Sequence, residues 1–298
     1  MRILIFGRVG QLGTELARRP WSAGTELTFL DRSEVDVGNP AAVRGVMAVT
    51  ACDLVINASG YTAVDKAESE AEIAFGVNRD GPAAMAGMCA SRGIPLLHVS
   101  TDYVFDGTKP TPYSEDDPIA PLGVYGRSKA EGEQAVRDAL AHHVILRTAW
   151  VYAAHGHNFV RTMLRLAAER PELRVVADQC GCPTAAADLA MALHRLADRY
   201  AREKTLTWGT YHFTGQGETS WHGFAERIVD LAAPVLGKRP VVQAIATADY
   251  PTPAQRPANS RLDCRRMTET FGITARPWEQ ALQEVVADLL AAQRTKAP

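Results

Sequence analysis

The chain has 298 residues, of which 46% are hydrophobic and 22% charged, so it can bury a sizeable core in one large domain or two unequal ones. Its 32 lysines and arginines nearly balance 34 acidic residues, and no segment carries a run of basic side chains, which argues against nucleic acid as a partner. The start, "MRILIFGRVG", lacks a signal-peptide pattern and no apolar stretch could cross a bilayer, so we expect no membrane association and a cytoplasmic location.

Short apolar runs alternate with helical patterns along the first two thirds of the chain. The expected strands are 2–6, 27–30, 53–58, 95–100, 144–148 and 173–177, with amphipathic stretches at about 11–19, 40–48, 66–91, 124–141 and 184–201 between them. Nearly continuous apolar strands indicate a sheet that is buried on both faces. The alternation therefore predicts an α/β fold with a Rossmann-like, doubly wound parallel sheet.

After Thr148 the sequence becomes aromatic and loop-like, and the region 215–257 is rich in Pro, Gly, Thr and Trp. We therefore expect a smaller α/β substrate-binding lobe beside the dinucleotide-binding domain. The predicted domain comprises 1–148 plus about 172–215, and the predicted lobe comprises about 149–171 plus 216–298.

The first expected strand runs into "GRVGQLG", which places Gly7, Gly10 and Gly13 at a strand-to-helix turn. A pyrophosphate at such a turn meets bare backbone N–H groups and the positive end of a helix. The second strand ends at Asp31 and Arg32, where a carboxylate suits the ribose hydroxyls of NAD and a guanidinium suits the 2′-phosphate of NADP. The sequence predicts dinucleotide binding with either cofactor.

The third strand ends in three small residues, Asn57, Ala58 and Ser59, at the sheet edge where ligands bind. The fourth strand ends in "STDYVFDG", which places the Ser100 and Thr101 hydroxyls at the same edge. A hydroxyl there can hold a substrate carbonyl and share its developing negative charge.

Two tyrosine–lysine pairs have the spacing that puts both side chains on one helix face: "YGRSK" at 125–129 and "YAREK" at 200–204. An unperturbed tyrosine is only about one part in a thousand ionised at pH 7, and a nearby ammonium is expected to lower its pKa. Thr101 precedes Tyr125 by 24 residues, whereas the residue 24 before Tyr200 is Val176, within an expected strand. We therefore expect Tyr125 and Lys129 to do chemistry and Lys204 to be dispensable.

The five cysteines are odd in number, and Cys180 and Cys182 have no second Cys or His pair at zinc-site spacing. Reduced thiols and no bound metal are expected.

Together, the glycine turn, the strand-end threonine and the Y-x-x-x-K helix resemble the extended short-chain dehydrogenase/reductase superfamily. The longer strings "GQLGTEL", "YTAVDKAE", "STDYVFDG", "YGRSKAEGE", "RTAWVY", "NFVRTMLRLA", "DQCGCPT" and "RPANSRL" occur in this order between residue 10 and residue 262. In sequence they resemble the dTDP-4-dehydrorhamnose reductase family.

The resemblance implies an NAD(P)H-dependent oxidoreductase that reduces C4 of dTDP-6-deoxy-L-lyxo-4-hexulose to give dTDP-L-rhamnose, using NADPH with NADH tolerated. It implies catalysis by Thr101, Tyr125 and Lys129. The implied cofactor contacts are Gly7, Val9, Gly10, Gln11, Leu12, Gly13, Asp31, Arg32, Asp36, Val37, Asn57, Ala58, Ser59, Tyr61, Tyr125 and Lys129. The implied contacts to the dTDP-sugar are Thr62, Asp102, Tyr103, Val104, Phe105, Trp150, Asn158, Arg256 and Asn259.

Some family members hold magnesium between subunits through glutamates, but this chain keeps Glu15 and reads "PTAAADLA" where a second glutamate is expected. No metal requirement is predicted, and a homodimer is left open. Two alternatives also stay open: another sugar-nucleotide epimerase or reductase, and a non-catalytic subunit resembling the methionine adenosyltransferase β subunit. A long Pro-rich loop between Thr101 and Tyr125 is predicted to cover the sugar.

Overall fold

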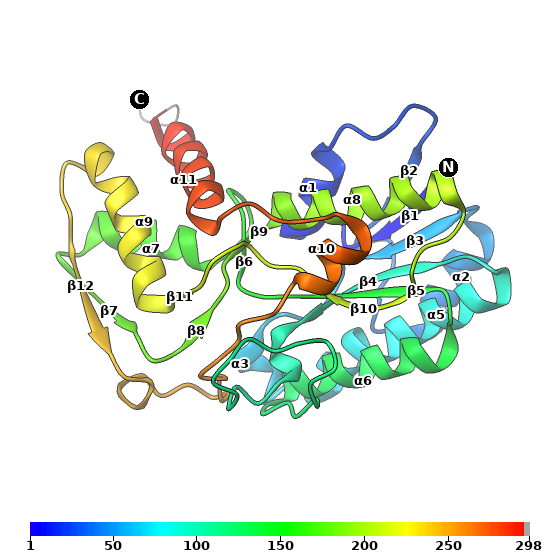
Figure 1. The fold of residues 1–298 in the computed structure, drawn as a ribbon, viewed down its shortest axis with the longest axis horizontal. Coiled ribbons are helices and arrows are strands. Elements are labelled where there is room, and N and C mark those ends of the chain that lie inside the picture. Colours follow the sequence, from blue (N-terminus) through cyan, green and yellow to red (C-terminus); the bar gives the residue numbers. More distant parts are fainter. Residues whose placement is uncertain (295–298) are drawn as a thin grey trace.

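Six parallel strands form the centre of the larger lobe in the computed structural model, which describes residues 1–294 (Figure 1). They are β1 (Arg2–Phe6), β2 (Glu26–Leu30), β3 (Leu54–Asn57), β4 (Leu96–Thr101), β5 (His143–Thr148) and β10 (Gly209–His212), in the order β10-β5-β4-β3-β1-β2. β2 lies on one side of β1 and β3 on the other, so the winding reverses between β1 and β3. A crevice for a ligand forms at the carboxyl ends of strands at such a reversal.

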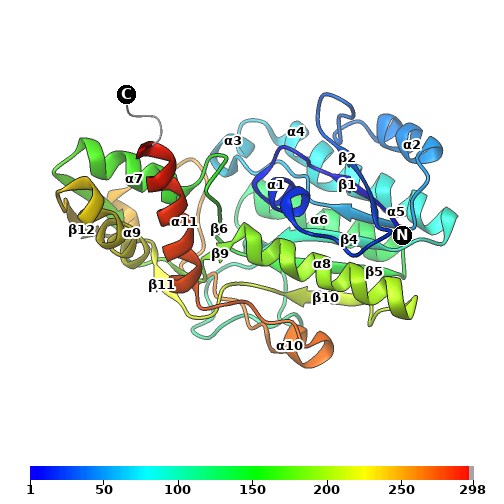
Figure 2. The same ribbon diagram turned by 90° about the horizontal axis from the view of Figure 1, so that it is seen from above.

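Two helical layers cover the sheet, as the sequence predicts (Figures 1 and 2). One layer consists of α1 (Gln11–Arg18) and α8 (Ala186–Glu203), and the other consists of α2 (Pro40–Val49), α5 (Gly81–Arg92) and α6 (Val124–Ala139). Alternate residues of β1 serve the two faces: Ile3 and Ile5 pack in the α1/α8 core, and Leu4 and Phe6 pack in the α2/α5 core. The apolar strands thus reflect burial on both faces.

Between β3 and α5 the chain forms α3 (Val64–Ala67), α4 (Ala71–Phe75) and a π-helical turn (Gly76–Asp80). A 3₁₀ turn (Asp102–Val104) follows β4 directly.

The smaller lobe packs around its own apolar core beside the carboxyl edge of the sheet (Figure 2). Its elements are β6 (Val151–Tyr152), α7 (Phe159–Glu169), β7 (Glu172–Val176), β8 (Cys180–Gly181), β9 (Thr184–Ala185), β11 (Thr219–Ser220), α9 (Trp221–Leu236), β12 (Val241–Ile245) with a 3₁₀ turn (Thr247–Asp249), and α11 (Trp278–Arg294). The predicted strand 173–177 exists as β7, but its place in the central sheet was wrong, because β7 pairs with β12.

The sixth strand of the sheet is β10, which was not predicted. Helix α10 (Arg265–Phe271) packs against this strand. Met267 and Ile273 share a core with Tyr211 of β10. We therefore propose a different lobe boundary, with the large lobe resuming at α8 rather than near 172 and including α10. Residues 295–298 of the predicted lobe lie outside the described residues.

Within residues 1–294, no helix combines the length and the apolar character needed to cross a membrane.

Candidate active site

A cavity of about 620 Å³ opens at the carboxyl edge of the sheet, between the two lobes. It is lined by the glycine turn, by the ends of β2, β3, β4 and β5, by the first turns of α6, and by side chains of the smaller lobe. Among the lining residues are Gly7, Val9, Gly10, Gln11, Leu12, Asp31, Arg32, Asp36, Val37, Ala58, Ser59, Tyr61, Thr62, Thr101, Asp102, Tyr103, Tyr125, Lys129 and Trp150. Most of the predicted site residues therefore meet in one place.

The glycine turn has a backbone that larger residues would not permit. Gly7 has φ +103°, and a Cβ there would lie 2.8 Å from the backbone of Ala58. A Cβ on Gly13 would lie 2.0 Å from the carbonyl oxygen of Gly7. Gly10 is the N-cap of α1 and has no side chain to cover the helix terminus. This bare backbone cradle fits the pyrophosphate of a dinucleotide.

Asp31 and Arg32 occupy the far end of the same cavity. The Asp31 carboxylate accepts hydrogen bonds from the Ser33 hydroxyl (2.5 Å) and backbone N–H (2.8 Å), which lower its pKa. Arg32 is exposed, and its guanidinium has no hydrogen-bond or ion-pair partner among residues 1–294. A carboxylate and an unpaired guanidinium suit a ribose that carries either a hydroxyl or a phosphate.

Helix α6 carries Tyr125, Lys129 and Glu133 on one buried face. The helix begins after Gly123, and the Glu68 side chain accepts a hydrogen bond from the Val124 backbone N–H at 2.8 Å, which holds the first turn in place. Lys129 Nζ donates to the backbone carbonyl of Val99 on β4 at 2.6 Å. The lysine is thus tied to the strand that ends in Thr101.

The pKa values of this pair follow from burial. Burial raises the pKa of Tyr125 to about 12, opposed by the nearby Thr101 hydroxyl. Burial lowers the pKa of Lys129 to about 8, opposed by the charge of Glu133. The net shift of the Tyr125 pKa is therefore upward and not downward as expected, because desolvation of the phenolate outweighs any stabilisation by Lys129.

Behind the lysine lies a fully buried ion pair. Arg147 donates to the Glu133 carboxylate at 2.7 and 2.9 Å, and the Ser100 hydroxyl donates to it at 2.5 Å. Burial alone would raise the pKa of Glu133, but the hydrogen bonds and charge of Arg147 hold it below its usual value. The pair fixes α6 against β4 and β5.

Thr101 and Asp102 stand side by side at the end of β4. The Thr101 Oγ1 atom lies 2.9 Å from Asp102 Oδ1 and accepts a hydrogen bond from the Tyr103 backbone N–H at 3.2 Å. Asp102 is 2% exposed, and burial raises its pKa to about 7.

Trp150 forms one wall of the cavity in a strained backbone conformation, with φ +49°. Its ring stacks on Trp221 at a centroid distance of 3.5 Å, and its indole N–H donates to the Ser260 hydroxyl at 3.3 Å. A Cβ on Gly181 would lie 2.4 Å from the same ring. Sequence reasoning missed Trp221 and His157, which also line the cavity, because neither belongs to a recognisable motif.

Several predicted site residues do not line the cavity. Gly13 and Asn57 lie behind its wall, and Val104, Phe105, Asn158, Arg256 and Asn259 have other contacts. The Asn158 amide donates to Gln11, Ala153 and His155 and caps α7. The Asn259 amide donates to the carbonyls of Lys109 and Thr111. These two amides hold the backbone together and have no free donor for a sugar.

Arg256 forms a bidentate ion pair with Asp65 of α3, at 2.7 and 3.0 Å. Arg256, an implied contact to the dTDP-sugar, is therefore paired with a carboxylate in this structure.

In the loop between Thr101 and Tyr125, Asp102 and Tyr103 line the cavity, whereas none of residues 104–124 does. The loop is held against the segment 259–263, where Tyr113 exchanges backbone hydrogen bonds with Arg261 and Asp263. A cover over the bound sugar therefore remains a prediction.

The second tyrosine–lysine pair lies at the end of α8, as expected. Lys204 is the C-cap residue with φ +58°, and Tyr200 packs near Trp208. Neither residue lines the cavity.

Glu15 lies 3.5 Å from His155, and Asp188 pairs with Arg276 at 2.9 Å. In the part of the chain that the structure describes, no cluster of three or more His, Cys, Asp or Glu side chains could hold a metal ion.

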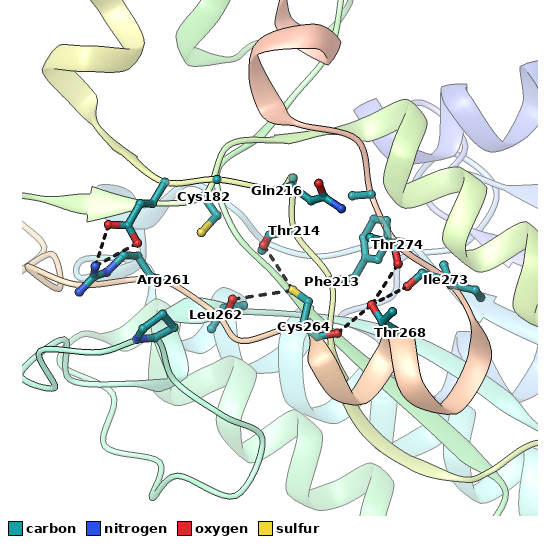
Figure 3. Close-up of a pocket in the computed structure, with 15 residues that line it drawn as sticks. Cys182, Phe213, Thr214, Gln216, Arg261, Leu262, Cys264, Thr268, Ile273 and Thr274 are labelled. Atoms are coloured by element: carbon teal, nitrogen blue, oxygen red, sulfur yellow. Dashed lines mark hydrogen bonds and ion pairs between the residues drawn. The ribbon is translucent and has the colours of Figure 1, made fainter.

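A smaller hollow of about 260 Å³ lies between α10 and the segment 213–218 (Figure 3). Two thiols face it, and the Thr214 hydroxyl lies 3.4 Å from the sulfur of Cys264. Burial raises the pKa of both Cys182 and Cys264. These thiols are therefore weak nucleophiles.

Comparisons with known proteins agree along nearly the whole chain. Residues 1–291 match the family profile described as the RmlD substrate binding domain. A dTDP-4-dehydrorhamnose reductase of Sinorhizobium fredii is 45% identical over 97% of this chain and 98% of its own length. The crystal structure of a dTDP-4-dehydrorhamnose reductase from Clostridium acetobutylicum has a TM-score of 0.89 at 37% identity, covering 96% of this chain and 99% of that one. A Bacillus anthracis dTDP-4-dehydrorhamnose reductase in complex with NADP has a TM-score of 0.88 at 34% identity, with the same coverage.

Proposed function

The chain belongs to the dTDP-4-dehydrorhamnose reductase family, and from this premise we propose that Thr101, Tyr125 and Lys129 carry its chemistry. The enzyme reduces C4 of dTDP-6-deoxy-L-lyxo-4-hexulose with NADPH, NADH also being usable, and the product is dTDP-L-rhamnose. The observation that supports these roles is that the three side chains line one cavity together with the glycine turn.

The glycine turn and the N-terminus of α1 bind the pyrophosphate of the cofactor, with Asp31 and Arg32 at its adenosine ribose. The reduced nicotinamide, when bound, supplies the hydride. Lys129 has three N–H donors, of which one is used by Val99, so the others can bind the nicotinamide ribose. Trp150, Thr62 and Tyr103 surround the sugar.

Thr101 donates a hydrogen bond to the C4 carbonyl oxygen, and Tyr125 donates its proton to that oxygen as negative charge develops. The raised pKa of Tyr125, about 12, keeps the phenol protonated at neutral pH, but it also makes the phenol a weaker acid in the ligand-free protein. The Lys129 ammonium then stabilises the phenolate that remains. The hydrogen bonds of Ser100 and Arg147 to Glu133 hold α6 against the sheet and so fix Tyr125 and Lys129 relative to Thr101.

The test is oxidation of NADPH by the purified protein in the presence of the 4-keto sugar nucleotide. Tyr125→Phe should lower kcat by about 100-fold or more, because it removes the acid but keeps the ring. Lys129→Met should lower kcat and weaken cofactor binding. NADPH binding to Tyr125→Phe, followed by fluorescence, should stay close to that of the wild type.

The chain provides its own matched controls in the second pair. Tyr200→Phe and Lys204→Met make the same chemical changes outside the cavity and should leave kcat unchanged. No NADPH oxidation by the wild type would exclude the reductase and favour a non-catalytic subunit. Sugar interconversion without net NADPH oxidation would favour an epimerase.

A homodimer and a cytoplasmic location remain predictions. Sedimentation of the purified chain and fractionation of cells that express it would measure them.

A further inference from the structure

Asp102 is a buried carboxyl group in direct contact with the catalytic threonine. It is 2% exposed, lines the cavity, and begins the 3₁₀ turn that follows β4. Its Oδ1 atom lies 2.9 Å from Thr101 Oγ1, and its Oδ2 atom has no hydrogen-bond partner among the described residues. An ionised carboxylate with one unpaired buried oxygen is costly, whereas a neutral acid in the same place costs much less.

The hydrogen-bonding capacity of Thr101 makes the protonation state of Asp102 important. A hydroxyl has one donor and two acceptor positions. The Tyr103 N–H already occupies one acceptor position of Thr101 Oγ1. If Asp102 is ionised, the single Thr101 proton must point back to Asp102, and none is left for a substrate carbonyl. If Asp102 is neutral, its own O–H fills the second acceptor position and the Thr101 proton is free to point into the cavity.

We propose that Asp102 is a positioning residue that works as a neutral acid, donating to Thr101 Oγ1 so that the Thr101 hydroxyl donates to the substrate carbonyl. This inference rests on the proposed reductase function and deepens it. Asp102 keeps its proton throughout, so the atoms of the reduction balance without it: hydride goes to C4 and the Tyr125 proton to the oxygen.

The surroundings of Asp102 favour the neutral form. Burial raises its pKa to about 7, although the Thr101 hydroxyl and, to a smaller extent, the Ser260 hydroxyl and nearby backbone N–H groups oppose this shift. The titratable groups that face it are Tyr103 of its own turn, Tyr125 of α6 and Cys182 after β8. None of these three is a cation, and Cys182 also faces the hollow in Figure 3.

The pH dependence follows directly. Below about pH 7 Asp102 is neutral, and the Thr101 hydroxyl proton is free to bond to the substrate carbonyl. Above about pH 7 Asp102 ionises, and the Thr101 proton bonds to the Asp102 carboxylate instead. The wild-type kcat should therefore fall on the alkaline side with an apparent pKa near 7.

The experiment measures kcat against pH for the wild type and for Asp102→Asn, whose amide N–H can donate to Thr101 at every pH. The variant should keep kcat within about threefold of the wild type at pH 6, and its alkaline decline should shift upward by about one pH unit, to the range of Lys129. Asp102→Ala, which has no donor, should lower kcat about tenfold or more across the range. Asp116→Asn, at an exposed site outside the cavity, should follow the wild-type profile.

An Asp102→Asn profile that matches the wild type would overturn the inference. The inference would also fail if Asp102→Asn, folded by circular dichroism, lost activity to the level of Asp102→Ala.

Infrared difference spectra of the ligand-free protein separate this inference from the proposed function. A protonated carboxyl band should be present at pH 6 in the wild type and absent from Asp102→Asn, and no band in the wild type would overturn the inference. If the wild type turns over the substrate and Asp102→Asn has the wild-type dependence of kcat on pH, only the role of Asp102 is overturned. If the wild type shows the carboxyl band but does not oxidise NADPH, the proposed function is overturned, and the role of Asp102 with it.

Discussion

We predict that Arg32 is the side chain that separates the two nicotinamide cofactors. It lines the adenosine end of the cavity next to Asp31, and no group among residues 1–294 pairs with its guanidinium. A free guanidinium is available for a phosphate, whereas a ribose hydroxyl gains little from it.

Arg32→Ala should raise KM for NADPH by about 10- to 100-fold, the cost of losing a charged hydrogen bond, and change KM for NADH by less than about threefold. Steady-state kinetics with each cofactor measures this split. Arg44→Ala, which removes an equally exposed arginine from α2 outside the cavity, is the control. Equal changes with both cofactors would mean that Arg32 does not contact the 2′-phosphate.

Single residues also show where prediction from sequence reaches its limit. Tyr125, Lys129 and Thr101 were predictable because their spacing on a helix and their place at a strand end determine where they point. Asn158 and Asn259 have the right chemistry for a sugar, but their amides are consumed by backbone groups. Whether a polar side chain bonds to its own fold or to a ligand depends on its neighbours in space, which sequence spacing does not reveal.

Among the elements, β8 supports the wall of the cavity through Gly181. The Trp150 ring is confined by the Gly181 backbone, by Trp221 at the start of α9 and by the Ser260 hydroxyl. A methyl group on Gly181 would overlap the ring, so the glycine in "DQCGCPT" has a packing reason that the sequence alone did not reveal.

Gly181→Ala should displace Trp150 and raise KM for the sugar nucleotide by about tenfold, while the KM for NADPH stays within about twofold. Trp150 fluorescence should change in parallel. Gly87→Ala, in an exposed position of α5 with open space around it, should change neither KM and should stabilise the helix by about 0.5–1 kcal/mol. An unchanged sugar-nucleotide KM in Gly181→Ala would show that the Trp150 position is not critical.

The strands of the central sheet differed in how well they could be predicted. β1, β3, β4 and β5 are continuous apolar runs, and all were predicted within two residues. β10 reads "GTYH" and carries too weak an apolar signal, because it is an edge strand that is only partly buried. β7 has the pattern of a strand, but periodicity does not specify which partner a strand will pair with.

For the whole molecule, the Asp65–Arg256 pair is a bridge between the lobes that lies close to the site. It joins α3 of the larger lobe to the start of the segment 256–262. Its bidentate geometry resembles the way in which a guanidinium binds a phosphate.

We predict that a bound diphosphate takes the place of Asp65. Arg256→Ala should then raise KM for the sugar nucleotide about tenfold, whereas Asp65→Asn should lower it or leave it unchanged. Arg239→Ala removes a surface arginine paired with Asp230 and should have no effect on KM. If Asp65→Asn and Arg256→Ala raised KM alike, the pair would be purely structural.

The path of the chain between the lobes limits how this protein can diversify. The chain leaves the larger lobe after β5, returns at α8, leaves again after β10, returns for α10 and then forms α11 in the smaller lobe. No continuous segment contains the whole smaller lobe. Replacing one stretch of sequence therefore cannot substitute the whole lobe with one that prefers another sugar. A change of sugar preference within this architecture is therefore expected to need substitutions in several separate segments of the chain.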